Sequence, residues 1–224
     1  MNTGFETYLV TQADLSAGRS TEEIVDAALA GGIGVVQVRE KHRSGAEQLQ
    51  VARALRAPTA EADVPLIIND RVDVAVAAGA DGVHLGDDDL PIEDARAQLG
   101  EEAIIGRSVS TVEDAKAAEA AGADYLGVGA IYRTGSKDVD DEEHEIGLGV
   151  VTDIADAVDI TFVGIGGVTP ERAPDVAAAG ADGVAVITAI TQAEDPEAAT
   201  RELAEGVAEG KQRRDGAAAA GGHA

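Results

Sequence analysis

The chain has 224 residues, and its 42 Asp and Glu residues outnumber 17 Lys and Arg residues, so the formal net charge at pH 7 is -25. A surface with this charge repels nucleic acid and anionic membranes, which excludes proteins that bind either. No apolar run approaches the roughly 20 residues of a membrane span, and no signal peptide opens the chain, so we expect a cytoplasmic protein.

The acidic residues are spread along the whole chain, and lysine occurs only at positions 41, 116, 137 and 211. This pattern is typical of proteins that stay soluble in concentrated salt, where repulsion between surface charges is screened. The alternative is an ordinary acidic enzyme.

Eight short segments, most of them continuous apolar runs bounded by Gly, Asp or Pro, are predicted to be strands. Continuous hydrophobicity indicates a strand that is covered on both faces, as in a parallel sheet with helices outside it. In chain order the predicted strands are 5–12, 34–40, 64–70, 82–86, 103–109, 125–131, 160–167 and 183–190.

A phrase rich in Ala and Gly precedes every second predicted strand. It reads Ala-Gly-Gly-Ile-Gly-Val-Val from residue 30 and Ala-Ala-Gly-Ala-Asp-Gly-Val, or a close variant, from residues 77, 120 and 178. Each copy predicts a helix that ends at a glycine with positive φ, followed by a strand. The copies lie roughly 45 to 60 residues apart, the length of two βα units.

Helix starts are predicted between the strands. Ser20 with Glu23 and Ser110 with Glu113 fit capping boxes, and Thr169-Pro170 fits an N-cap followed by proline at the first helical position. Eight βα units predict a single (β/α)8 TIM barrel over residues 1–210, with a flavodoxin-like open sheet as the alternative. Residues 211–224 lose hydrophobic periodicity and are predicted to form a disordered tail without function.

In such a barrel the functional site lies where the strands end, because the βα loops meet at that face. Polar or glycine residues follow seven consecutive predicted strands. The candidate site residues are Gln37, Arg39, Lys41, Asn69, Asp70, Asp89, Ser108, Thr134, Ser136, Lys137, Gly167, Ile187 and Thr188.

The residue types indicate the chemistry of the site. Arg39, Lys41 and Lys137 would cluster cations inside an acidic shell, which implies a strongly anionic substrate. Asp70 and Asp89 offer oxygen ligands that suit Mg²⁺, an ion that completes its octahedron with water and substrate phosphates. The glycine-rich turn after the seventh strand and the turn after the eighth fit the phosphate site common in this fold. The site is therefore predicted to hold two phosphorylated groups.

Simpler interpretations remain for single residues. Asp70 could merely cap the next helix, and Asp87 and Asp88 could be solvated charges. His84 lies inside a predicted strand and is expected to be a packed core histidine. The acidic run 138–145 is expected to form a lid or a solvated loop.

In combination, order and spacing, the motifs from Tyr8 to about Ala208 resemble the thiamine-phosphate synthase family. The residues that carry the resemblance are Gln-Val-Arg-Glu-Lys at 37–41, Asn-Asp at 69–70, Gly-Val-His-Leu-Gly at 82–86 followed by Asp89, Gly-Val-Gly-Ala-Ile-Tyr at 127–132 followed by Thr134 and Lys137, Gly-Ile-Gly-Gly-Val at 164–168, and Gly-Val-Ala-Val-Ile at 183–187.

The resemblance implies a transferase that joins 4-amino-2-methyl-5-hydroxymethylpyrimidine diphosphate to 4-methyl-5-(2-hydroxyethyl)thiazole phosphate, releasing diphosphate by a dissociative mechanism. It implies Mg²⁺ on Asp70 and Asp89, with diphosphate held by cationic and amide side chains and no general base. By the same resemblance Gln37 orients the pyrimidine and Ser108 lies beside the reacting centre. Diphosphate would contact Arg39, Lys41, Asn69 and Lys137, and thiazole phosphate would contact Thr134, Ser136, Gly167, Ile187 and Thr188.

The chain departs from the family pattern at Asp87, Ala130 and Ser136, and Asp87 leaves open which aspartate would ligate the metal. Two other functions stay open: a thiazole tautomerase on the same barrel, and a phosphate-binding module without catalysis. The sequence leaves the oligomeric state open, a homo-oligomer included. The expected partners are small-molecule substrates.

Overall fold

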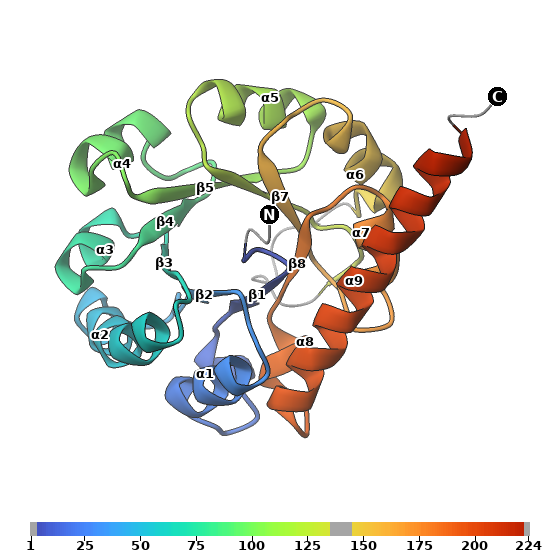
Figure 1. The fold of residues 1–224 in the computed structure, drawn as a ribbon. Helices are drawn as coiled ribbons and strands as arrows, with labels where there is room; N and C mark the ends of the chain where they lie inside the picture. The colour runs from blue at the N-terminus through green and yellow to red at the C-terminus, as the bar shows by residue number, and fades with distance from the viewer. Residues whose placement is uncertain (1–3, 135–144, 222–224) are drawn as a thin grey trace.

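Eight parallel strands form a closed barrel in the order in which they occur along the chain. The computed structural model describes residues 4–134 and 145–221. Figure 1 shows the barrel nearly along its axis, with the strands in a ring. The strands are β1 (Thr7–Val10), β2 (Val35–Val38), β3 (Leu66–Asn69), β4 (Gly82–Leu85), β5 (Ile104–Val109), β6 (Tyr125–Val128), β7 (Thr161–Ile165) and β8 (Gly183–Val186).

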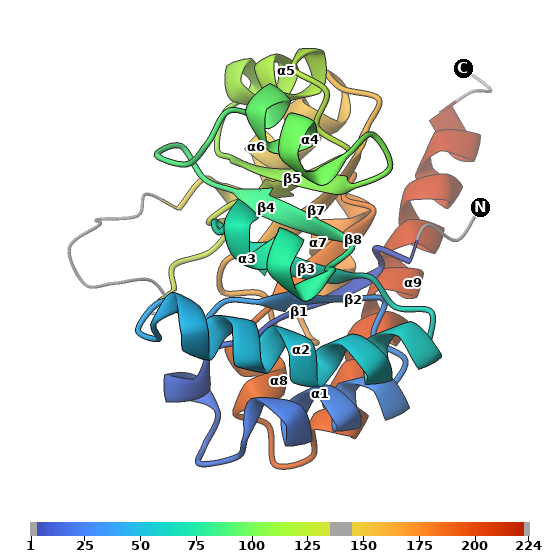
Figure 2. The same ribbon diagram turned by 90° about the vertical axis from the view of Figure 1, so that its left-hand side faces the viewer.

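Helices surround the ring (Figures 1 and 2). Within the described residues, no helix has the length and apolar character that crossing a membrane requires. A short 3-10 helix, η1 (Ala13–Leu15), follows β1, and the α-helices are α1 (Thr21–Ala30), α2 (Gly45–Glu61), α3 (Val72–Ala78), α4 (Ile92–Leu99), α5 (Val112–Ala120), α6 (Gly147–Ala155), α7 (Ala173–Ala178), α8 (Thr188–Thr191) and α9 (Pro196–Gly221).

The prediction of a (β/α)8 barrel is therefore confirmed, and each predicted strand contains one observed strand. The predicted segments are longer because the flanking residues continue the apolar pattern beyond the strands. In the last segment the prediction is wrong for residues 188–190, which belong to helix α8. The apolar core has two parts: a large layer between the strands and the helices, and a small cluster inside the barrel. The inner cluster contains both Tyr8 and Tyr125, which are fully buried.

The repeated phrase has a structural role at the end of the barrel where the strands begin. As predicted, its helix-ending glycines have positive φ, from +64° at Gly79 to +124° at Gly180. The aspartate of each later copy makes a reciprocal pair with the preceding strand: its N–H donates to a strand carbonyl, and its carboxylate accepts from the N–H of the same residue. The pairs are Asp81 with Leu66, Asp124 with Ile105 and Asp182 with Phe162.

The first copy shows why aspartate is absent there. Gly34 occupies the aspartate position, and its N–H donates to the carbonyl of Thr7 over 3.0 Å. A Cβ at this position would overlap the carbonyl oxygen of Gly4, so a side chain does not fit. The hydroxyl of Thr7 supplies the second hydrogen bond, accepting from the N–H of Gly34.

The predicted helix starts differ in their outcome. Ser20 and Glu23 form the predicted capping box of α1. The prediction for α5 is wrong by one residue, because Thr111 is the N-cap and its side chain accepts from the N–H of Asp114. The prediction at Thr169-Pro170 is also wrong: these residues form a turn, and α7 begins at Ala173.

The prediction of a disordered tail does not hold for residues 211–221, which continue α9 as helix to Gly221. A Cβ at Gly210 would overlap the carbonyl oxygen of Pro174, so glycine permits close approach of α9 to α7. Farther along, Arg213 pairs with Asp175 at 3.0 Å and Arg214 donates to the carbonyl of Gly180. The last turns of α9 extend beyond the neighbouring helices (Figure 2).

The reciprocal aspartate pairs predict a loss of stability without a loss of activity. Asp182→Ala removes the acceptor of the Phe162 N–H and should lower the free energy of unfolding by about 1–3 kcal/mol. Asp153→Ala, which removes an exposed helical carboxylate, should change it by less than about 0.5 kcal/mol. Chemical denaturation measures both, and equal stability of the two variants would contradict the assigned role of Asp182.

Candidate active site

Inward-facing residues of the strands surround a cavity within the barrel. Inward and outward residues alternate along a strand, so Gln37 and Arg39, two positions apart, both face this cavity. We call it the inner compartment. Its polar lining residues are Tyr8, Gln37, Arg39, Asn69, His84, Ser108 and Tyr125.

A second cavity, the outer compartment, shares Ile165, Ala185 and Ile187 with the inner compartment. It is lined by Thr134, by the turn after β7 and by the start of α8. Gly166 and Gly167 have φ of +97° and +63°, and Cβ atoms there would crowd the backbone of residues 130–133. Glycine is thus required for this turn, which presents backbone rather than side chains to the cavity.

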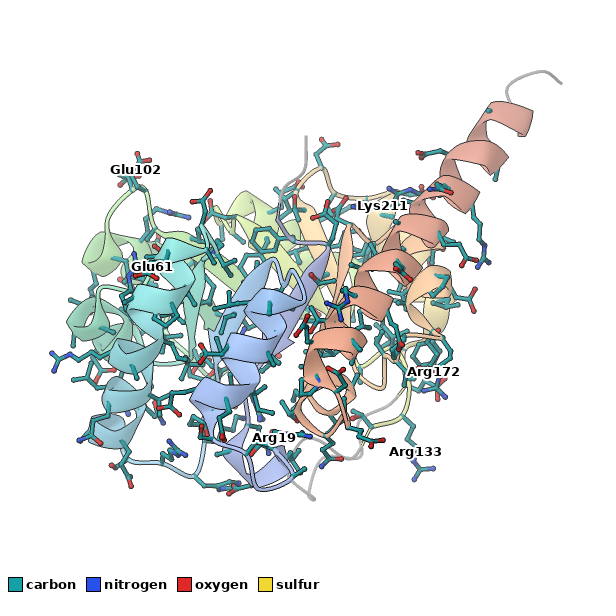
Figure 3. The ribbon with its side chains drawn as sticks, turned by 60° about the horizontal axis from the view of Figure 1, so that its bottom comes forward. Arg19, Glu61, Glu102, Arg133, Arg172 and Lys211 are labelled. Carbon is teal, nitrogen blue, oxygen red and sulfur yellow. The ribbon has the colours of Figure 1, made fainter. Side chains whose placement is uncertain are left out.

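The Arg172 side chain braces this turn from outside. Its guanidinium donates to the carbonyl of Gly167 over 2.7 Å and lies 4.5 Å from the centre of the Tyr132 ring. Figure 3 shows Arg172 and Arg133 toward the same end of the barrel as Arg19, whereas Glu61 and Glu102 lie at the opposite end. The two compartments therefore open at the end where the strands terminate.

Two carboxyl groups and two cations meet beside the inner compartment. Burial and the adjacent Asp89 carboxyl raise the pKa of Asp70 to about 6, while Lys41 and Arg39 act in the opposite direction. Asp89 is held in place by the N–H of Gly86, which donates to its carboxylate over 2.6 Å. The site thus combines paired acids, which repel one another without a cation, with cations suited to an anion.

Comparison with known proteins decides the family. A profile of the family described as thiamine monophosphate synthase matches residues 7–190. The chain is 60% identical to thiamine-phosphate synthase of Natronomonas pharaonis over 92% of this chain and 97% of that protein. It is also 60% identical to the same enzyme of Haloarcula marismortui, over 92% and 99% of the two chains. The chain belongs to the thiamine-phosphate synthase family.

The solved structures agree with this assignment. A thiamine phosphate pyrophosphorylase from Pyrococcus furiosus is 38% identical and superposes with a TM-score of 0.83 over 93% of this chain and 98% of that one. A 3-hexulose-6-phosphate synthase, at 19% identity and a TM-score of 0.65 over 91% of this chain and 100% of that one, shares the fold. The protein is therefore an enzyme, a transferase of thiamine biosynthesis.

The structure distinguishes Asp70 of this enzyme from a helix cap. The N-cap of α3 is Arg71, and no side chain caps that helix. Asp70 has φ of +62°, a left-handed conformation that Asp and Asn tolerate better than most residues. Its carboxyl group lies beside that of Asp89, which helps to raise the pKa of Asp70.

Asp87 has a different environment from Asp89. Its side chain is 89% exposed and pairs with Arg107 at 2.9 Å. Arg107 also donates to the carbonyl of Gly86 over 2.6 Å, and so β5 braces the loop that carries Asp89. Asp87 thus pairs with Arg107. Asp89 is the aspartate of this loop that lies beside Asp70.

Glu40 supports the candidate site, and the sequence analysis did not select it. Its side chain is only 2% exposed, and it accepts hydrogen bonds from the hydroxyls of Thr11 and Thr21 and from the N–H of Ala13. These bonds fasten the loop after β1 to the end of β2. Arg39 is held from the same loop, since its guanidinium donates to Gln12 over 2.7 Å. The only signal in the sequence is a carboxylate between two cationic residues.

Tyr8, His84 and Tyr125 were also not selected as site residues. His84 is buried, as expected, but it also lines the inner compartment and bonds to Tyr125 and Ser108, each at 2.9 Å. Tyr125 replaces the glycine found at this position of two other copies of the repeat, and its ring occupies the space left by Gly106. That replacement is the signal that could have identified it.

Ser136 and Lys137, with residues 138–144 of the acidic run, lie outside the described residues. Among residues 4–134 and 145–221, no group of three or more His, Cys, Asp or Glu side chains could hold a metal ion. The structure brings the other predicted residues to the two compartments or to the acid pair beside them.

The raised pKa of Asp70 predicts how stability depends on pH in protein treated with a chelator. Asp70 binds a proton more tightly when folded, so its contribution lowers stability as pH rises from about 4 to above 6. Asp70→Asn removes this contribution and keeps a residue that tolerates the backbone. Above pH 6 it should be more stable than the native enzyme by about 1 kcal/mol, a value reduced for solvent screening.

Denaturation at several pH values measures this difference, which should disappear near pH 4. A constant difference across the range would assign the effect to packing instead of charge.

Proposed function

We propose that the inner compartment binds the pyrimidine diphosphate and the outer compartment binds the thiazole phosphate, so that the enzyme joins them to give thiamine phosphate and diphosphate. The observation that carries this assignment is the acid pair flanked by Arg39 and Lys41 beside the inner compartment. Tautomerisation of a thiazole phosphate involves no diphosphate and gives no reason for such a pair.

The donor set at Asp70 and Asp89 suits Mg²⁺. This ion takes one or two protein carboxylates and fills its remaining positions with water and phosphate oxygens, so a larger cluster of protein ligands is not required. The repulsion that raises the pKa of Asp70 would be relieved by a cation between the two carboxylates. Bound there, Mg²⁺ would neutralise charge that develops on the departing diphosphate.

Side chains of the protein would assist the reaction of the two substrates. The C–O bond of the pyrimidinylmethyl diphosphate breaks with its electron pair on diphosphate, and the thiazole nitrogen then gives its lone pair to the carbon cation. No proton is lost, so no general base is assigned. Arg39, Lys41, Asn69 and Lys137 are proposed to stabilise the leaving group electrostatically.

Gln37 and Ser108 are proposed to orient the pyrimidine, because both line the inner compartment. The thiazole phosphate is assigned to Thr134, Ser136, Gly167, Ile187 and Thr188, with the last three acting largely through backbone N–H groups. Of these five, the four described residues all line the outer compartment. The walls shared by the two compartments would bring the reacting carbon and nitrogen together.

Turnover of the two substrates to thiamine phosphate tests the proposal. We expect product only with Mg²⁺, and a fall in kcat of about 100-fold or more for Asp70→Asn, Asp89→Asn or Lys137→Ala, since each removes charge stabilisation in the transition state. Asp88→Asn, at an exposed neighbouring position, should stay within about 2-fold of the native rate. Full activity in EDTA would contradict the metal site, and near-native rates in the three site variants would contradict the residue assignment.

We further propose that the charge of -25 reflects adaptation to salt. The 60% identical relatives come from Natronomonas and Haloarcula, which is consistent with this proposal. Screening should reduce repulsion between surface carboxylates, so Tm should rise between about 0.1 M and molar KCl. A Tm that is unchanged or lower in molar KCl would contradict the proposal. Cytoplasmic location and a homo-oligomeric state stay predictions.

A further inference from the structure

Five side chains from five strands form one continuous chain of hydrogen bonds inside the barrel. The amide nitrogen of Gln37 donates to the hydroxyl of Tyr8 over 2.7 Å, and this hydroxyl lies 2.7 Å from that of Tyr125. The Tyr125 hydroxyl lies 2.9 Å from Nδ1 of His84, whose Nε2 lies 2.9 Å from Oγ of Ser108. Gln37 and Ser108, the two ends, both line the inner compartment.

The two tyrosines remain protonated. Burial raises the pKa of Tyr8 above its ordinary value, and burial followed by the neighbouring Tyr8 does the same for Tyr125. Each hydroxyl therefore has one proton to donate and an oxygen that accepts. This fixes the number of protons that the chain can distribute.

We infer that the Gln37 amide sets the direction of the following bonds. Tyr8 accepts from Gln37, and its own proton is then assigned to the oxygen of Tyr125, the next acceptor along the chain. Tyr125 in turn donates to Nδ1 of His84. A neutral imidazole whose Nδ1 accepts carries its proton on Nε2. Nε2 then donates to Ser108, and the serine's own proton points away from the ring.

We propose that Tyr8, Tyr125 and His84 are positioning residues that hold Ser108 as a donor and the Gln37 carbonyl as an acceptor toward the inner compartment. The chain commits one amide proton of Gln37 to Tyr8 and so fixes which way the amide faces. This inference rests on the proposed binding of the pyrimidine in the inner compartment. The inference adds an explanation of which groups in that compartment donate hydrogen bonds and which accept them.

An aminopyrimidine matches this polarity. Its exocyclic amine is a donor for the Gln37 carbonyl, and its ring nitrogens are acceptors for the Ser108 hydroxyl. A ring with oxygen in place of the amine would present an acceptor to an acceptor, and the site would reject it because a buried polar group would be left unpaired. The geometry thus points to discrimination between amino and oxo pyrimidines.

The tautomer of His84 tests the polarity directly and requires no substrate. In protein labelled with ¹⁵N-histidine, at about pH 8 where imidazole is ordinarily neutral, ¹⁵N NMR should show His84 with its proton on Nε2 and a bare Nδ1. His84→Asn identifies the resonances by their loss. A proton on Nδ1 in the native enzyme would overturn the proposal, because the chain would then run in the opposite direction.

Tyr8→Phe should change this signature while keeping the ring. Without the Tyr8 hydroxyl, Tyr125 loses the partner at 2.7 Å that orients its proton, and His84 should show both tautomers. Tyr132→Phe is the matched control, since it removes a tyrosine hydroxyl that belongs to the outer compartment's surroundings and should leave the His84 resonances in place. An unchanged His84 tautomer in folded Tyr8→Phe would overturn the proposal.

Kinetics separate positioning from simple structural support. Tyr8→Phe should lower kcat about 10-fold with little change in KM for the thiazole phosphate, and Ser108→Ala should be at least as severe. In the Ser108→Ala background, Tyr8→Phe should have no further effect on kcat, because the group through which it acts is gone. Additive losses would overturn the proposal. Absence of product from the native enzyme would instead contradict the proposed function, and the NMR result would stand apart from it.

Discussion

Closure of the parallel sheet is the constraint on which the rest of the structure depends. Each strand is only four to six residues long, and closure brings all their carboxyl ends to one face. Residues that are far apart in the sequence, such as Gln37 and Ser108, thereby line one cavity. The opposite face fastens the strands through reciprocal backbone and carboxylate bonds at Asp81, Asp124 and Asp182. The bonds that stabilise the barrel and the residues of the candidate site consequently lie at opposite ends of the same strands.

The candidate site contains cationic side chains, whereas the protein as a whole is strongly negative. A chain with an excess of 25 negative charges places Arg39 and Lys41 beside paired carboxyls at the mouth of the barrel. Buried Glu40 helps to keep this positive charge in place. It bonds to the loop after β1, and Gln12 of that loop accepts a hydrogen bond from Arg39. The acidic shell keeps the protein apart from other polyanions, and the local cations retain attraction for a small phosphorylated substrate.

Much of the fold and of the candidate site could be predicted, because both depend on patterns that are local in sequence. Apolar runs located all eight strands, and the predicted site residues include six of the nine polar residues that line the two compartments. Predictions failed where a tertiary contact decides the outcome. The helix beyond residue 210 depends on packing against α7, whereas the cap of α5 is a local difference of one residue, with Thr111 in place of Ser110. Tyr8, Tyr125 and His84 stand within apolar runs of the sequence, and their polar atoms come together only inside the closed barrel.

The three aspartate pairs, together with the contact between Gly34 and Thr7, divide the barrel into four two-strand units. In each of the last three units, the aspartate just before the even-numbered strand bonds to the odd-numbered strand that precedes it. In the first unit, the N–H of Gly34 bonds to the carbonyl and the hydroxyl of Thr7 instead. Each fastening therefore joins residues no more than 27 positions apart along the chain. Gene duplication of such a unit copies the fastening together with the strands, so a barrel enlarged in this way gains new loops for chemistry without having to evolve new closures for its other end.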